Sequence, residues 1–209
     1  MQEKLKALET LISERFAGES SGHDTFHIAR VVKNARWIAE REGVDSLWPE
    51  VLAWVHELGD YKVEEGLDPA QEIKKALTQC GFSEGDIETV VSWAADIGFR
   101  GGLAPKQDIP IEVAIVSDAD LIDALGAMGV ARTFAYGGTK GREMYNPNIP
   151  PVAFSDAEEY KKNQGPTHNH FYEKLLRLPQ YLRTKSGQEL GAQRHKITKD
   201  FLEQFEAEM

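Results

Sequence analysis

Three stretches of the chain place histidine or carboxylate side chains among apolar residues. His56 and Glu57 are adjacent in VLAWVHELGDYK, where an apolar run ends. His27 lies earlier, in GHDTFHIARV, and Asp118 lies later, in IPIEVAIVSDADLIDALGAMGVAR. A buried imidazole beside a carboxylate is costly unless a cation satisfies both. These residues therefore predict a metal centre. The mixed imidazole and carboxylate ligands favour Mn, Fe, Co, Ni or Zn over Ca, which prefers an all-oxygen shell.

The acidic run SDADLID offers three carboxylates, and one of them must be chosen as a ligand. An exposed acidic helix face explains Asp120 and Asp123 well. It explains Asp118 less well, because Val116 and Ala119 crowd around it in the sequence. We therefore expect Asp118 to complete the metal site.

Helices must bring these side chains together. Asp24 or Thr25 is a suitable cap for a helix that runs to about residue 41 and carries His27. A short apolar helix from 47 to 58 ends at Gly59. Because neighbours on a helix point about 100° apart, the adjacent histidine and glutamate near its end can both reach one ion. Pro110 suits the first turn of the helix that carries the acidic run.

The rest of the chain also has helical rather than strand patterns. Apolar residues at three- and four-residue steps predict a first helix, and further helices are expected at 69–79, 83–97, 168–178 and 188–208. Nowhere is there a convincing period-2 strand. The exception is the segment at about 137–167, which is rich in Gly and Pro and is expected to form a loop. A loop of this length in a compact domain is usually functional or mobile. The sequence predicts an all-α fold of about eight or nine helices. We expect a single domain over 1–209, with its metal-binding core at about 22–135 and C-terminal helices at about 168–208.

Composition limits the classes of partner. The net charge of −10, from 24 basic and 34 acidic residues, argues against nucleic acid and against anionic membranes. Cys80 is the only cysteine, so a disulfide within the chain and a cysteine-based zinc site are excluded. The first residues lack the apolar core of a signal peptide, and no run approaches the roughly 18 apolar residues of a membrane span. A cytoplasmic protein is expected.

The order H…HE…D resembles the H…HD…D metal signature of the HD-domain phosphohydrolases. The likeness extends from about residue 22 to 176, through the blocks GHDTFHIARV, SDADLIDALGAMGVARTFAYGGTKGR and HNHFYEKLL. These blocks are similar to a bacterial subgroup whose characterised activity is metal-dependent nucleotide pyrophosphohydrolysis. The resemblance implies an HD-type helical bundle that binds one divalent metal, with Mn, Ni, Co or Fe favoured and Mg or Zn also compatible.

The same resemblance implies a reaction and roles for further residues. A nucleoside triphosphate, or a deoxynucleotide, would be cleaved to monophosphate and pyrophosphate by a water that the metal activates. Asp60 matches a family acidic residue thought to orient or deprotonate that water. The loop at 136–151 could fold over the substrate. Arg30 could pair with an acidic neighbour and so brace the helix that carries His27, instead of binding substrate. The substrate-binding candidates are His23, Lys62, Arg132, Lys140, His170 and Lys174.

One residue departs from the family pattern. The second block usually reads His-Asp, and this chain has His56-Glu57. Glutamate keeps the charge and the oxygens but extends the reach by about 1.5 Å. It could still bind the ion, bind it through both oxygens, or shift the ion and alter the metal preference.

Three other readings stay open at this point. A sensor would bind a nucleotide in the same pocket with weak or no catalysis. An oxygenase with two irons would need extra histidines between the second and last ligand blocks, and there are none from Glu57 to Asp118. A purely structural helical protein would leave the metal-type residues unexplained. A homodimer is neither indicated nor excluded.

Overall fold

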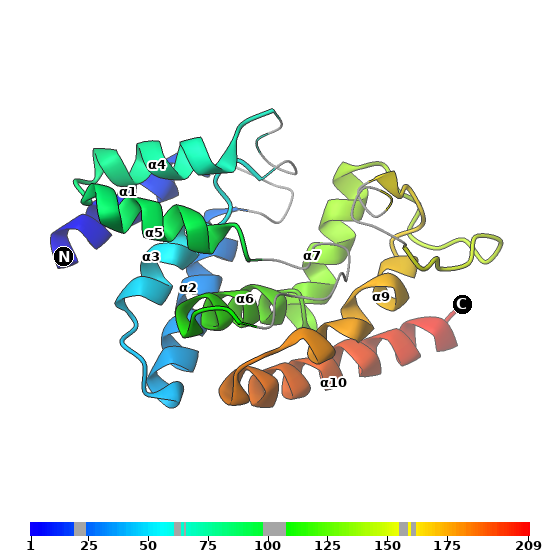
Figure 1. The fold of residues 1–209 in the computed structure, drawn as a ribbon. Helices are drawn as coiled ribbons and strands as arrows, with labels where there is room; N and C mark the ends of the chain where they lie inside the picture. Colours follow the sequence, from blue (N-terminus) through cyan, green and yellow to red (C-terminus); the bar gives the residue numbers. More distant parts are fainter. Residues whose placement is uncertain (19–23, 61–63, 65, 98–107, 155–158, 160–161) are drawn as a thin grey trace.

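The computed structural model describes residues 1–18, 24–60, 64, 66–97, 108–154, 159 and 162–209. In these ranges the regular secondary structure is entirely helical, which confirms the all-α prediction (Figure 1). The helices are α1 (Gln2–Arg15), α2 (Thr25–Glu42), α3 (Leu47–Val55), α4 (Pro69–Gln79), α5 (Glu84–Ala94), α6 (Ile111–Asp123), α7 (Gly126–Thr139), α9 (Asn169–Glu173), the 3-10 helix η2 (Leu175–Tyr181) and α10 (Lys185–Ala207).

Local sequence signals explain where several helices begin and end. The Asp24 side chain accepts a hydrogen bond from the backbone N–H of His27 at 2.7 Å and so caps α2. Ser83 and Asp86 form the expected capping box at the start of α5. Gly43 ends α2 in a left-handed conformation, with φ of 71°.

The centre of the molecule is formed by α2, α3 and α6. Helix α2 packs against both α3 and α6, and α3 also contacts α6. Fully buried side chains such as Val31, Leu52 and Ile115 fill the space between them. Helices α1, α4 and α5 lie on one side of this centre, and α7, α9 and α10 lie on the other (Figure 1). The start of α2, the end of α3 and the last turn of α6 come close together. Buried polar side chains at such a place are costly unless they are paired.

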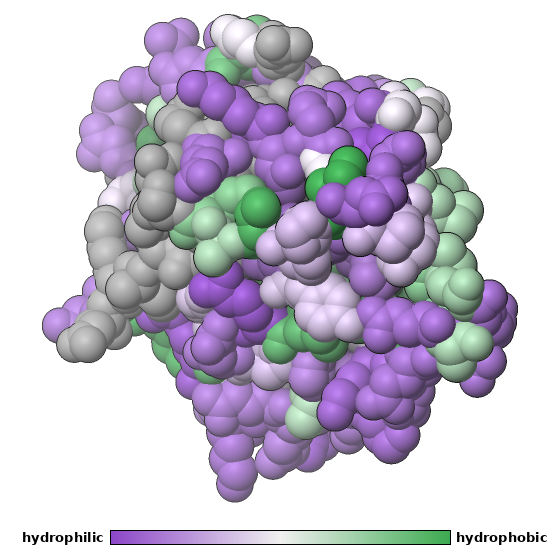
Figure 2. Space-filling view, turned by 90° about the vertical axis from the view of Figure 1, so that its right-hand side faces the viewer, coloured by the Kyte–Doolittle hydropathy of each residue, from purple (hydrophilic) through white to green (hydrophobic). Residues whose placement is uncertain are grey.

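The segment after α7 is irregular but tied to the helices. Helix α7 continues to Thr139, so the expected loop begins about three residues later than predicted. The buried Glu173 carboxylate of α9 accepts hydrogen bonds from the Val152 backbone at 3.2 Å and from Asn163 Nδ2 at 2.9 Å. On this side of the molecule the surface is mostly hydrophilic, with hydrophobic residues in small separate patches (Figure 2).

The C-terminal region differs in detail from its prediction. The helix expected at 168–178 is divided into α9 and η2, and the backbone of Lys174 between them is non-helical. Helix α10 begins at Lys185, three residues before the predicted start, because Thr184 caps it. Among the described helices, none is long and apolar enough to cross a bilayer.

Candidate metal centre

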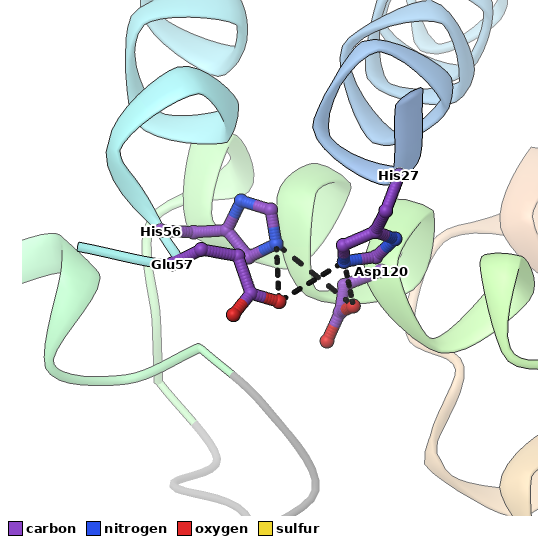
Figure 3. Close-up of side chains that lie close together, drawn as sticks. All are labelled: His27, His56, Glu57 and Asp120. Atoms are coloured by element: carbon purple, nitrogen blue, oxygen red, sulfur yellow. Dashed lines mark hydrogen bonds and ion pairs between the residues drawn. The ribbon is translucent and has the colours of Figure 1, made fainter. Parts of the chain in front are cut away.

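Four side chains from the three central helices converge on one point. They are His27, His56, Glu57 and Asp120, and one ligand atom of each lies within 4.8 Å of the others. His27 comes from the first turn of α2, His56 and Glu57 directly follow α3, and Asp120 comes from α6 (Figure 3). Three of these four residues were predicted from the sequence, and the structure brings those three together.

The distances within the group suit a single ion. His27 Nε2 lies 3.0 Å from Glu57 Oε1 and 3.6 Å from Asp120 Oδ1. His56 Nε2 lies 3.5 Å from the same glutamate oxygen and 4.0 Å from the same aspartate oxygen. An ion about 2.1 Å from each donor requires neighbouring donors to be roughly 3.0–3.5 Å apart. Small side-chain adjustments would therefore complete the coordination.

His56 carries a second sign that a cation belongs here. Its side chain is 4% exposed, and its Nε2 has no hydrogen-bond partner among the described residues. Its Nδ1 lies 2.6 Å from the Ala53 carbonyl oxygen, so Nδ1 is the protonated nitrogen and Nε2 faces the group. A buried polar atom without a partner is rare in native proteins. Two imidazoles and two carboxylates form a donor set that fits a divalent transition metal.

The charges of the group affect the protonation of His56. Burial lowers the pKa of His56, but the interaction with Glu57 and the charge of Asp120 outweigh this and raise it to about 9. Without metal, the group therefore holds a proton at neutral pH. A metal ion must displace that proton before it can bind His56.

A tight turn positions the histidine-glutamate pair. Gly59 has φ of 71°, a conformation that favours glycine, and its N–H donates to Glu64 Oε2 at 2.8 Å. A Cβ at this position would lie 2.7 Å from the Pro69 Cα atom at the start of α4. Arg15 of α1 forms an ion pair with Glu64, in which Arg15 Nε lies 2.6 Å from Glu64 Oε1. The turn after α3 is thus fixed by both α1 and α4.

Asp118, which the sequence predicts as a metal ligand, lies outside the four-residue group in the structure. Its buried carboxylate accepts hydrogen bonds from the backbone N–H groups of Arg183 and Thr184 and from the Thr184 hydroxyl, at 2.7–3.1 Å. Residues two apart on a helix point about 200° from each other, so Asp118 faces α10 while Asp120 faces the metal group. Burial indicated a specific role for Asp118, but that role is to anchor the start of α10.

Asp123, which had been read as part of an exposed acidic face, is fully buried. Its Oδ2 lies 2.7 Å from His27 Nδ1, the ring nitrogen that faces away from His56, Glu57 and Asp120. Arg30 and Arg132 also bind this carboxylate. Burial raises the pKa of Asp123, but the hydrogen bonds from His27 and Arg30 and the charge of Arg132 outweigh it, and the pKa lies well below its usual range. The spacing of three between Asp120 and Asp123 is a helical spacing that could have indicated their shared face.

The chain is similar in sequence to known proteins. Residues 26–125 match the sequence profile of the HD domain family. The chain is 31% identical to YpgQ, an uncharacterized protein of Bacillus subtilis, over 204 residues that cover 97% of this chain and 92% of YpgQ. The chain belongs to the HD domain family.

Solved structures of three other proteins resemble this one over nearly the whole chain. An HD-superfamily hydrolase from Bacillus thuringiensis is 36% identical, with a TM-score of 0.73 over 99% of this chain and 97% of its own. A protein from Lactobacillus plantarum is 30% identical, with a TM-score of 0.88 over 100% and 97% of the two chains. YpgQ in complex with ADP is 30% identical, with a TM-score of 0.75 over 98% and 97%. These relationships support a metal-dependent hydrolase.

Among the described residues, the other side chains predicted for the site are not part of the four-residue group. Arg132 binds Asp123, and the Lys140 ammonium lies 5.6 Å from the centre of the Tyr136 ring. His170 lies in α9 and Lys174 directly follows it. Asp60 follows the ligand pair, and its backbone N–H donates to the Glu57 carbonyl at 3.1 Å. His23 and Lys62 lie outside the described residues.

Proposed function

We propose that this protein is a metal-dependent phosphohydrolase that cleaves nucleoside or deoxynucleoside triphosphates to monophosphate and pyrophosphate. The observation that carries the hydrolase assignment is the convergence of His27, His56, Glu57 and Asp120 on one point. The nucleotide assignment is supported by the likeness to the pyrophosphohydrolase subgroup and by YpgQ, a relative that binds ADP.

The residues of the group would hold one divalent ion, and the donor set favours Mn, Co, Ni or Fe. Such an ion supplies a water of lowered pKa and polarises a phosphoryl oxygen. Two carboxylates in the group offset the charge of the ion. To bind the ion, His27 and His56 must present unprotonated Nε2 atoms, and each has its Nδ1 beside an oxygen that can accept a hydrogen bond from the ring N–H.

Asp60 is our candidate for the proton acceptor. It directly follows the ligand turn, is half-buried, and is joined to Glu57 through the backbone. In the proposed reaction, the water oxygen attacks the α-phosphorus and the bond from that phosphorus to the bridging oxygen breaks. Pyrophosphate leaves, and the proton of the water passes to the Asp60 carboxylate.

The triphosphate needs cations besides the metal. Lys140, His170 and Lys174 remain our candidates for direct contact, together with His23 and Lys62. Of these, Lys140 directly follows α7, His170 lies in α9 and Lys174 directly follows α9. Arg132 instead binds the Asp123 carboxylate.

One specific residue favours a second function. Glu57 replaces the usual aspartate, and a shifted ion would weaken catalysis while leaving a nucleotide pocket intact. The alternative is therefore a nucleotide-binding sensor. It would show thermal stabilisation by nucleotide without turnover.

The two functions are separated by incubating the purified protein with a nucleotide panel and Mn, Co, Ni or Mg, before and after chelation. We expect pyrophosphate release that is lost with EDTA and restored by the metal. Absence of any metal-dependent phosphate or pyrophosphate release would sink the enzymatic proposal. Asp60→Asn is the matched variant, since it removes the proton acceptor but keeps the four ligands. It should lower kcat about 100-fold while metal affinity is unchanged.

A further inference from the structure

Asp123 is placed to control one metal ligand without touching the metal. It lies one helical turn after Asp120 on α6 and is fully buried. Its Oδ2 is 2.7 Å from Nδ1 of His27, whose Nε2 points into the metal group 3.0 Å from Glu57. An ionised carboxylate can only accept hydrogen bonds, so Nδ1 must carry the ring proton. In the neutral ring that binds a metal, the lone pair is then on Nε2.

Two arginines from different helices hold this carboxylate. Arg30 of α2 donates from Nε to Oδ1 at 2.8 Å and from Nη2 to Oδ2 at 3.1 Å. Arg132 of α7 donates from Nη1 to Oδ2 at 2.9 Å. A buried carboxylate is costly without such partners. Both oxygens of Asp123 are therefore fixed in position, and α2, α6 and α7 meet at a single side chain.

We propose that Asp123, held by Arg30 and Arg132, is a positioning unit for the metal centre. It sets the ring orientation and the protonated nitrogen of His27, and thereby the affinity for the divalent ion. Arg132 acts through Asp123 rather than by direct contact with phosphate. The inference rests on the metal centre proposed above, but not on the identity of the substrate.

A purely structural brace between helices is the competing explanation. A brace would change the stability of the metal-free fold and leave the metal affinity of the folded protein as it was. A positioning unit would change the affinity even where the metal-free protein remains folded. Metal affinity, measured alongside metal-free stability, therefore distinguishes the two.

The test compares Asp123→Asn with Glu50→Gln. Glu50 is a matched control, because it is also a buried carboxylate bound by an α2 arginine, with Arg36 Nη2 at 2.6 Å and the Ser46 hydroxyl at 2.7 Å. Mn²⁺ is titrated calorimetrically into each metal-free protein, and thermal unfolding is recorded without metal. We expect Asp123→Asn to weaken Mn²⁺ binding about 10- to 100-fold, and Glu50→Gln to change it less than about twofold. The visible spectrum of the Co²⁺-loaded protein should change only for Asp123→Asn.

Arginine variants keep the inference testable if Asp123→Asn does not fold. Arg132→Gln and Arg30→Gln should each weaken Mn²⁺ binding about tenfold, and Arg132→Lys should restore part of the loss. Wild-type affinity in all of these variants would overturn the positioning role. Failure of the wild-type protein itself to bind Mn²⁺ would instead overturn the metal centre on which the inference rests.

Discussion

Asp118 and Asp120 are two residues apart on α6, and they contact different parts of the molecule. The first binds the start of α10, and the second joins two histidines and a glutamate. Both are acids in an apolar helix, so composition and burial alone do not separate them. The difference arises from helical geometry, since the two side chains point in nearly opposite directions.

Substitution of Asp120 should lower metal affinity, whereas substitution of Asp118 should lower the stability of the fold. Asp120→Asn removes a ligand charge, so we expect Mn²⁺ affinity to fall at least about 100-fold with little change in metal-free stability. Asp118→Asn leaves the N–H donors of Arg183 and Thr184 facing an amide, which should cost about 1–3 kcal/mol of unfolding free energy. Calorimetric titration and denaturant unfolding of both variants check this. A loss of metal binding in Asp118→Asn alone would restore the sequence-based assignment.

Metal affinity should also depend on pH. Because the pKa of His56 is raised to about 9 in the metal-free group, a metal must displace its proton at any lower pH. Mn²⁺ affinity should therefore rise by up to about tenfold for each pH unit between 6 and 8. Titrations in buffers of different ionisation enthalpy should show about one proton released per ion. An affinity that is independent of pH would contradict this.

His27, His56 and Glu57 were found from the sequence because each stands out against its neighbours. Glu57 follows a histidine at the end of an apolar helix, and His27 lies on an apolar face. Asp120 and Asp123 did not stand out, because an acidic run on a helix usually faces water. Only the packing of α2 and α7 against α6 reveals that this face is covered.

At the scale of the elements, the start of α10 is held against α6 by Asp118. The cap residue Thr184 both binds Asp118 and accepts from the Gly187 N–H at 2.9 Å. There is no room at Gly187 for a side chain, since a Cβ would lie 2.3 Å from Asp118 Oδ2 and 2.6 Å from Thr184 Oγ1. The acid, the cap and the glycine therefore form one junction between the two helices.

Gly187→Ala should disrupt this junction. We expect a loss of about 1–3 kcal/mol in unfolding free energy, because the added methyl group forces the carboxylate or the helix start to move. Gly85→Ala in α5 is the control, since a Cβ there meets nothing within 4 Å and alanine favours a helix. Thermal unfolding of both variants measures the effect. Equal stability of the two variants would mean that the junction tolerates the methyl group.

The helices themselves were largely predictable, whereas some of their ends were not. The caps at Asp24 and Ser83 act through neighbouring residues and can be recognised in the sequence. The start of α10 lies three residues before its prediction, although its cap is local, with the Thr184 hydroxyl accepting from the Gly187 N–H. Similarly, the Gly-Gly pair at the end of α7 suggested a loop, but Gly137 packs against Thr167 and remains helical.

At the scale of the whole molecule, a metal bound by the four-residue group would link three helices that also pack through apolar side chains. The site draws on α2, the end of α3 and α6, so ion binding and folding are thermodynamically coupled. The net charge of −10 adds to the attraction for a cation. The periodicity of apolar residues in the sequence predicts the helices of the central core. It does not predict which ends of α2, α3 and α6 come together, because that depends on tertiary packing.

Divalent metal should therefore stabilise the whole fold. At a free metal concentration of about 100 times Kd, binding adds about 2.7 kcal/mol. For a chain of this size, each kcal/mol raises Tm by about 2–4 °C, so Mn²⁺ should raise Tm by roughly 5–10 °C over the EDTA-treated protein. Differential scanning calorimetry measures the shift. Asp120→Asn should lose most of it, and an identical Mn²⁺-dependent shift in that variant would point to binding elsewhere.

The most direct test of the metal centre is a crystal grown with Mn²⁺ and measured at a wavelength where manganese scatters anomalously. We predict one strong anomalous peak per chain, about 2 Å from His27 Nε2, His56 Nε2, and one oxygen each of Glu57 and Asp120. No peak among these four side chains, or a peak bound by Asp118 instead of Asp120, would contradict the account.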